Sequence, residues 1–195
     1  MSNNKLQYYK DFCQKITAEH ADYEREEHED RNVLEEIIFP YILATYEPQT
    51  ILDIGREDYQ QFYNEFFAGR ELWSIDFDPE RHEFGADKHI TDDAANIKSH
   101  FQDNYFDFIL MNGVFGWGLN DPAKIEQTFS GIYDILKPGG IFILGWNDIK
   151  DLTPVPLTEI EALKKFTPVP CPELNDQTQF KCINGEHTYN FFTKN

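Results

Sequence analysis

The spacing of hydrophobic residues divides the chain into two parts. Up to about residue 48, hydrophobic residues recur at helical spacing, as in the series Val33, Leu34, Ile37, Ile38 and Tyr41. From residue 50 onward, short apolar runs of strand length alternate with longer stretches of helical period. This pattern predicts an N-terminal helical region followed by an α/β sheet whose strands are joined by helices.

The second part of the chain contains five apolar runs of strand length. Strands are expected at residues 51–54, 72–75, 88–90, 106–111 and 141–144. Helices are expected at residues 59–67, 93–100 and 121–136, and a shorter one is expected from a capping box of Thr158 and Glu161 to residue 166. The alternation of strand and helix favours a mostly parallel sheet.

The C-terminal residues predict an antiparallel hairpin. Residues 178–183 and 186–192 have strand patterns, and Asn184 and Gly185 between them form the dipeptide favoured in two-residue turns. We therefore expect a three-layer α/β fold, mostly parallel with a C-terminal antiparallel hairpin. Within a single domain, residues 1–49 are expected to form a helical extension or lid, and residues 50–195 the main body.

Charge and cysteine content narrow the partners and the compartment. The 195 residues include 17 Lys and Arg against 35 Asp and Glu, a formal net charge of −18, which repels phosphate backbones and anionic lipids. Nucleic acid and membranes are therefore not expected as partners, and the acidic stretch 22–30 is expected to be a solvated helix face or loop. The odd number of cysteines (Cys13, Cys171 and Cys182) and the polar N-terminus favour a cytoplasmic protein with reduced thiols.

Other catalytic patterns are weak or missing. The six histidines lack the spacing of a metal site, and the sequence contains neither a Gly-x-Ser-x-Gly elbow nor a P-loop. Tyr133 and Lys137 have the Tyr-x-x-x-Lys spacing of short-chain dehydrogenases, but no glycine-rich dinucleotide loop accompanies them. An oxidoreductase is therefore only a weaker alternative.

Two strand ends carry acidic residues at a spacing typical of nucleotide-binding folds. The first strand ends in Asp53-Ile54-Gly55, where glycine permits a tight turn and close approach of a ligand to the backbone. Asp76 ends the second strand, 76 − 55 = 21 residues after Gly55, the distance at which a carboxylate reaches ribose hydroxyls. Asp78 is the alternative, with a helix cap or a solvated charge as its simpler role.

Three further motifs follow in order. They are Asp92-Asp93-Ala94, the strand 106–111 followed by Asn112-Gly113, and Leu136-Lys137-Pro138-Gly139-Gly140 before the last parallel strand. Together with the two strand ends and the terminal hairpin, they resemble the class I, Rossmann-like S-adenosylmethionine-dependent methyltransferases. The resemblance runs from residue 50 to the C-terminus, although the first motif is degenerate: Glu57 and Tyr59 stand where the family has glycines.

The resemblance implies S-adenosylmethionine as cofactor and places several residues around it. These are Asp53, Gly55, Asp76, Asp93 and Asn112. Asp93 corresponds to a family residue that contacts the adenine amino group, although it could equally be a helix N-cap. Because Glu57 would repel the cofactor's carboxylate, Arg56 could pair with that carboxylate instead; the alternative is that Arg56 points to solvent.

The methyl acceptor is expected outside the carboxyl ends of the strands. Substrate-binding candidates there are Phe115, Trp117, Trp146 and Asn147, whose aromatic rings suit a flat small molecule unless they are core residues. The catalytic residue is not fixed by the pattern; candidates for a base are Asn112, Asp148 and His187. We therefore expect a methyltransferase acting on a small molecule, with a non-catalytic binding or regulatory protein of the same fold as the alternative, and with no prediction of oligomeric state.

Overall fold

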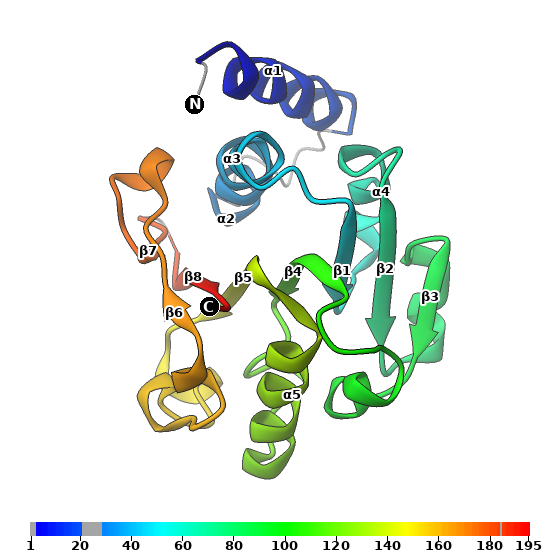
Figure 1. The fold of residues 1–195 in the computed structure, drawn as a ribbon, viewed down its shortest axis with the longest axis vertical. Coiled ribbons are helices and arrows are strands. Elements are labelled where there is room, and N and C mark those ends of the chain that lie inside the picture. The colour runs from blue at the N-terminus through cyan, green and yellow to red at the C-terminus, as the bar shows by residue number, and fades with distance from the viewer. Residues whose placement is uncertain (1–2, 21–28, 184) are drawn as a thin grey trace.

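The computed structural model describes residues 3–20, 29–183 and 185–195, which form three layers (Figure 1). Helices α1 (Asn3–Glu19), α2 (Glu29–Asn32) and α3 (Phe39–Thr45) lie on one side of a central sheet. Helix α5 (Pro122–Ile135) covers the opposite side, and the short α4 (Tyr63–Phe66) follows the first strand. The N-terminal helices are thus one of the layers.

The sheet has the strand order β3-β2-β1-β4-β5-β8-β6, with β7 also paired to β8. Its strands are β1 (Thr50–Ile54), β2 (Glu71–Asp76), β3 (Lys88–Thr91), β4 (Phe106–Asn112), β5 (Leu136–Asn147), β6 (Thr167–Pro168), β7 (Gln179–Lys181) and β8 (His187–Thr193). Strands β1 to β5 pair in parallel, whereas β8 runs antiparallel to β5, β6 and β7. The predicted fold class is therefore confirmed.

Two hydrophobic cores lie on the two faces of the sheet. On one face Leu34, Ile38 and Ile42 pack with sheet residues that include Phe108 and Ile143. These helical residues are four positions apart, so they form one apolar stripe across the π-helical segment Val33–Ile38 and α3. The sheet therefore needs the N-terminal helices to bury this face.

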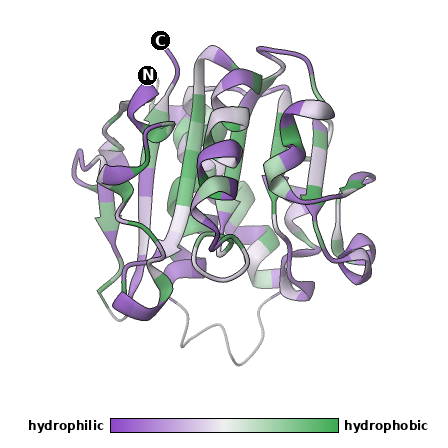
Figure 2. Ribbon diagram, turned by 90° about the horizontal axis from the view of Figure 1, so that it is seen from below, coloured by the Kyte–Doolittle hydropathy of each residue, from purple (hydrophilic) through white to green (hydrophobic). Residues whose placement is uncertain are grey.

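The other core forms beneath α5. Ile125, Phe129 and Ile132 are buried along one side of the helix, while Figure 2 shows hydrophobic residues concentrated in the central strands. Asp121 caps the helix by accepting hydrogen bonds from the backbone N–H groups of residues 123 and 124 at 2.9 and 3.0 Å. The predicted start of this helix is confirmed.

The prediction of one continuous helix at residues 59–67 is wrong. The chain forms a 3₁₀ turn, Asp58–Gln60, and then the single-turn α4. Glu57 and Gln60 close a capping box around the 3₁₀ turn, in which the Gln60 side chain accepts a hydrogen bond from the Glu57 N–H at 2.8 Å. The capping box stabilises the short turn, and the burial of Tyr63 and Phe66 holds α4 in place, so the chain does not form one continuous helix here.

Two other predicted helices are 3₁₀ segments. Residues 94–99 form one after an Asp93 cap, and residues 157–166 contain two short turns, Leu157–Glu159 and Leu163–Lys165. In the second region, Glu126 of α5 accepts hydrogen bonds from the N–H groups of Glu161 and Ala162 at 2.7 and 2.8 Å. A carboxylate from another helix thus replaces the predicted capping box.

The predicted terminal hairpin is confirmed by the antiparallel pairing of β7 and β8. Asn184, predicted for the turn, and residues 22–28 of the acidic stretch lie outside the described residues. Across the described part of the chain, no helix has the length and apolar character needed to cross a membrane.

Candidate functional site

A cavity of about 870 Å³ lies where β1, β2 and β4 reach their carboxyl ends. Small-molecule sites in proteins commonly enclose ~300–1,000 Å³, so its size suits a nucleotide-sized ligand with a second small molecule. Eight residues singled out from the sequence contribute to its lining: Gly55, Arg56, Asp76, Asp93, Asn112, Trp117, Asn147 and His187. The structure therefore brings most of the candidate residues together at one end of the sheet.

Gly55 forms the turn that opens the cavity after β1. Its φ of +78° lies in the left-handed region, and a Cβ added there would approach the Val114 Cγ2 atom to 2.3 Å. Its N–H donates to the Ile75 carbonyl at 2.9 Å, which links the turn to β2. Glycine is required here for both the backbone angle and the space.

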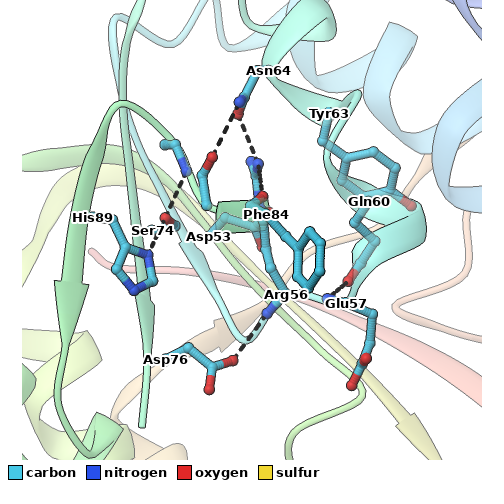
Figure 3. Close-up of polar contacts among 12 residues, drawn as sticks. Asp53, Arg56, Glu57, Gln60, Tyr63, Asn64, Ser74, Asp76, Phe84 and His89 are labelled. Atoms are coloured by element: carbon cyan, nitrogen blue, oxygen red, sulfur yellow. Dashed lines mark hydrogen bonds and ion pairs between the residues drawn. The ribbon is translucent and has the colours of Figure 1, made fainter. Parts of the chain in front are cut away.

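Asp76 stands at the end of β2, beside this turn (Figure 3). Its Oδ2 accepts a hydrogen bond from the Arg56 N–H at 3.2 Å, and its Oδ1 accepts one from the Asp78 N–H at 2.9 Å. A carboxylate has about four acceptor positions, so Asp76 keeps the capacity for ribose hydroxyls. Asp78 instead caps the next turn by accepting from the Glu80 N–H, the simpler of its two predicted roles.

Asp53 and the Arg56 guanidinium do not face the cavity, which corrects their expected direct contact with the cofactor. Both side chains are 1% exposed, and Arg56 Nε donates to Asp53 Oδ2 at 2.7 Å. Arg56 Nη1 also donates to Asn64 Oδ1 at 2.7 Å and to the Phe84 carbonyl at 3.3 Å (Figure 3). Burial raises the pKa of Asp53, while Arg56 opposes that rise. The pair ties the loop to the interior.

Glu57 does not leave an uncompensated charge at the degenerate glycine motif. Its carboxylate forms an ion pair with Arg81, another residue of the cavity lining. The repulsion expected between Glu57 and a ligand carboxylate is therefore reduced by Arg81, not by Arg56.

Asp93 combines a cap with a place in the cavity wall. Its Oδ1 accepts from the Ala95 N–H at 2.9 Å, and its Oδ2 accepts from Lys124 Nζ at 2.6 Å. The hydrogen bond from Lys124, followed by that from the Ala95 backbone, lowers the pKa of Asp93. The N-cap role is confirmed, and the remaining lone pairs leave room for an amino donor.

Asn112, which ends β4, and His187, which begins β8, form a hydrogen-bonded pair in the cavity lining. Asn112 Oδ1 lies 2.9 Å from His187 Nε2, and the His187 residue is 7% exposed. Because an amide oxygen only accepts, Nε2 carries the hydrogen and Nδ1 is the basic nitrogen. Burial lowers the pKa of His187, against a rise caused by nearby Asp30, so the imidazole is neutral at pH 7.

Gly145 of β5 leaves the space for this pair. An added Cβ would lie 2.0 Å from Asn112 Oδ1 and 2.9 Å from His187 Nε2. Asn112, Gly145 and Tyr189 are aligned across β4, β5 and β8. The sheet register therefore fixes where the imidazole sits.

The aromatic candidates separate into core and cavity residues. Trp117 is 61% exposed and lines the cavity, with its Nε1 donating to Asn147 Oδ1 at 3.0 Å. Phe115 and Trp146 are buried in the core under α5, where their rings lie 5.7 Å apart, so their predicted substrate contact is wrong. Asp148 is exposed, pairs with Lys181 at 3.4 Å and is not part of the cavity lining, so it is a poor candidate for the base.

Several lining residues were not singled out from the sequence as site residues. Phe77, directly after Asp76, is 68% exposed at the cavity and offers a flat apolar surface. The others include Arg31, Tyr59, Arg81, Lys124 and Glu186. Phe77 could have been predicted, because it is an aromatic residue directly after the acidic end of a strand. Arg31 and Glu186 come from distant segments, and no sequence pattern links them to the site.

Tyr133 and Lys137, which have the spacing of short-chain dehydrogenases, contact different parts of the protein and do not line the cavity. Lys137 Nζ donates to Asp107 Oδ1 at 2.7 Å and to Thr50 Oγ1 at 3.2 Å, next to the start of β1 and β4, opposite the cavity. Tyr133 instead lies beneath the ammonium groups of Lys165 and Lys194. Within the residues described, no three His, Cys, Asp or Glu side chains gather as a potential metal site.

Part of the chain matches a known protein family. Residues 52–144 match the family model described as "Methyltransferase domain". A curated demethylmenaquinone methyltransferase from Symbiobacterium thermophilum is 49% identical over 43 residues, which are 22% of this chain and 16% of that enzyme. The chain thus matches only a small part of this relative's length.

Solved structures with the same fold cover nearly the whole chain. A SAM-dependent methyltransferase from Archaeoglobus fulgidus is similar with a TM-score of 0.60 and 16% identity, over 93% of this chain and 98% of that one. The N-methyltransferase NodS from Bradyrhizobium japonicum, in complex with S-adenosyl-L-homocysteine, is similar with a TM-score of 0.57 and 18% identity, over 93% and 97%. The resemblance seen in the sequence is confirmed: residues 52–144 match a methyltransferase domain, and the fold is that of Rossmann-like SAM-dependent methyltransferases.

Proposed function

We propose that the protein is an S-adenosylmethionine-dependent methyltransferase acting on a small molecule. The observation that carries this proposal is that Gly55, Asp76, Asp93 and Asn112 line one cavity at the carboxyl ends of the parallel strands. This is the edge at which open α/β sheets bind nucleotides.

The residues present fit the adenosine part of this cofactor. The Asp76 carboxylate suits a pair of ribose hydroxyls, and the exposed Phe77 ring beside it suits a nucleobase face. Asp93 suits the adenine amino group. Gly55 keeps the first loop clear of side-chain atoms at the cavity edge.

The bound cofactor supplies a methyl group already activated on a sulfonium, so the protein's task is mainly alignment. His187 begins β8, which β1, β4 and β5 separate from the end of β2 with Asp76 and Phe77, so the His187 part of the lining is the place left for a methyl acceptor. Trp117, held by Asn147, forms part of the wall there.

A small acceptor is favoured by the size and the charge of the site. The cavity holds little beyond a nucleotide and one small molecule, and the net charge of −18 disfavours nucleic acid. The partial match to an enzyme named for demethylmenaquinone is in keeping with a small molecule, without identifying this one.

Two further proposals concern location and organisation. A cytoplasmic location is supported by three free, buried cysteines, whose thiol pKa values are raised by burial. We also propose that residues 1–49 form an extension to a body at residues 50–195, with α2 closing one side of the cavity through residues 29–31.

A non-catalytic binding or regulatory protein is the second candidate. The specific observation in its favour is the loop after Gly55, where Glu57 and Tyr59 line the cavity at positions where the family has glycines. Loss of cofactor binding through this loop would leave the fold intact.

Calorimetric titration with S-adenosylmethionine and S-adenosylhomocysteine separates the two candidates. The enzyme proposal expects micromolar binding that Asp76→Ala weakens at least about tenfold, a loss of ~1.4 kcal/mol. Asp87→Ala, an exposed acidic residue outside the cavity lining, is the matched control and should bind as wild type does. Folded wild-type protein that binds neither ligand would favour the non-catalytic candidate.

A further inference from the structure

We infer that the buried Arg56 side chain is a positioning residue for Asp76, the carboxylate proposed to bind the cofactor's ribose. This inference rests on the proposed function and adds how the site keeps its shape without the family's glycines. It comes from the contacts of two loops, a first loop at residues 55–62 after β1 and a second loop at residues 77–87 after β2. Both loops contribute to the cavity lining (Figure 3).

The Asp76 carboxylate is held by one backbone N–H group from each loop. The Arg56 N–H of the first loop donates to Oδ2 at 3.2 Å, and the Asp78 N–H of the second loop donates to Oδ1 at 2.9 Å. Because each oxygen accepts one of these bonds, a shift of either loop turns the carboxylate. The direction in which Asp76 offers its remaining lone pairs therefore depends on how the two loops are placed.

The Arg56 guanidinium fixes that placement through three partners. Its Nε donates to Asp53 Oδ2 at 2.7 Å, and its Nη1 donates to Asn64 Oδ1 at 2.7 Å and to the Phe84 carbonyl at 3.3 Å (Figure 3). Asp53 lies in β1, Asn64 in α4 and Phe84 in the second loop. The donors of a guanidinium have fixed directions in one plane, so this single side chain imposes one arrangement on three parts of the fold.

Two more hydrogen bonds reach the second loop. Asn64 Nδ2 donates to the Gly85 carbonyl and Gln61 Nε2 donates to the Glu83 carbonyl, both at 3.2 Å. The Gln61 bond is exposed and competes with water. Asn64 is half-buried, and because its Oδ1 accepts from Arg56, its amide nitrogen is the atom left for Gly85. Arg56 therefore also orients the second contact.

Burial makes the Arg56 contacts persistent. The side chains of Arg56 and Asp53 are each 1% exposed, so water does not compete for the bond between them. Hydrogen bonds between charged groups in such surroundings are among the stronger ones in proteins. Glycines in a turn leave the backbone conformationally free. In this chain Glu57 and Tyr59 replace two of them, and the buried network supplies the rigidity of the loop.

A positioning role and a purely structural role of Arg56 lead to different binding behaviour. If Arg56 only stabilises the fold, a folded variant without it binds the ribose as wild type does. If Arg56 positions Asp76, such a variant keeps the fold but loses the part of the affinity that depends on the ribose hydroxyls. The two roles are separated by measuring that part alone.

The experiment is calorimetric titration with S-adenosylhomocysteine and with its analogue that lacks the 2′ and 3′ hydroxyl groups. Wild type should prefer the hydroxylated ligand about tenfold to a hundredfold, because hydrogen bonds to a charged group are lost with the analogue. Asp76→Ala should bind both ligands about equally. The double variant Asp53→Leu with Arg56→Met removes both buried charges together and is expected to fold. Its preference should fall below about threefold, although Asp76 is unchanged.

Two further variants keep the test decisive. Asn64→Ala, outside the cavity lining, preserves the buried ion pair but removes the links to Arg56 Nη1 and Gly85, and should lower the preference about threefold. Glu126→Ala removes two hydrogen bonds at α5, also outside the lining, and should keep the wild-type preference. Urea unfolding, measured for each variant, shows which of them are folded.

The outcomes distinguish this inference from the proposed function. A wild-type preference in the folded double variant or in Asn64→Ala overturns the positioning role, and so does an equal loss of preference in Glu126→Ala. If the double variant does not fold, Asn64→Ala alone decides. Wild-type protein that binds neither ligand, or binds both equally, overturns the proposed cofactor site instead.

Discussion

At the scale of single residues, the most informative feature is how each acidic side chain is used. Asp76 and Asp93 line the cavity and can accept further hydrogen bonds there, whereas Asp53 forms a buried ion pair with Arg56. Spacing from Gly55 pointed to Asp76 because strand length and helix length fix that distance. It could not show that Asp53 turns inward, since the direction of a side chain at a glycine turn depends on the tertiary structure around it.

The Asp53 and Arg56 pair is expected to be critical for stability. Arg56→Met should lower the free energy of unfolding by about 3–5 kcal/mol, because it leaves a buried carboxylate without its cation. The double variant Asp53→Leu with Arg56→Met should recover much of that loss. Urea denaturation measures both, and a loss below about 1 kcal/mol in the single variant would show that the pair is not needed.

Glu71 gives a pH-dependent test at the opposite end of β2. Its Oε1 accepts hydrogen bonds from Lys88, Trp73 and Tyr105 at 2.6, 2.9 and 2.7 Å, which lower the pKa of Glu71 to about 2. A depressed acid stabilises the folded state above its unfolded pKa of ~4.3, and this stabilisation is lost as pH falls toward 2.

Wild type should therefore be more stable than Glu71→Gln at pH 7, and the difference should shrink between about pH 4.5 and pH 2. Denaturant unfolding at a series of pH values measures it. Glu80→Gln, at an exposed position, is the control without this dependence. A difference that stays constant with pH would contradict the hydrogen-bonded carboxylate.

At the scale of elements, the sequence located the strands better than the helices. The apolar runs of β1, β4 and β5 are buried on both faces, so their pattern is continuous and easily recognised. The segment at residues 157–166 shows why helices were harder. Its predicted capping box was replaced by Glu126, a residue far away in sequence, and no local pattern reports such a contact.

Glu126 is expected to hold this segment against α5. Glu126→Ala should cost about 1–2 kcal/mol, because it removes the acceptor for two backbone N–H groups. Hydrogen exchange at Glu161 and Ala162 should accelerate, whereas Glu126→Gln, which keeps one acceptor oxygen, should show a smaller change. Unchanged exchange at these two amides would contradict the cap.

At the scale of the whole molecule, the N-terminal helices are structural as well as close to the cavity. Leu34, Ile38 and Ile42 cover a sheet face that includes Phe108 and Ile143. The sequence predicted these helices but not their place, because helical spacing shows that an apolar stripe exists without showing which surface it covers.

A chain that begins at Thr50 is therefore expected to lose its fixed tertiary structure. Its exposed sheet face should bind a hydrophobic dye, and its near-ultraviolet circular dichroism should be lost. The full chain measured in parallel is the control. A truncated protein with native circular dichroism and cooperative unfolding would show that the sheet does not need the N-terminal helices in order to fold.

The most direct test of the central claim is a crystal structure of the protein grown with S-adenosylhomocysteine. We expect density in the cavity between Gly55, Asp76 and Asn112, with ribose oxygens at hydrogen-bond distance from the Asp76 carboxylate and the base against Phe77. Ligand bound elsewhere, or a cavity without ligand at saturating concentration, would contradict the assignment of this cavity as the cofactor site.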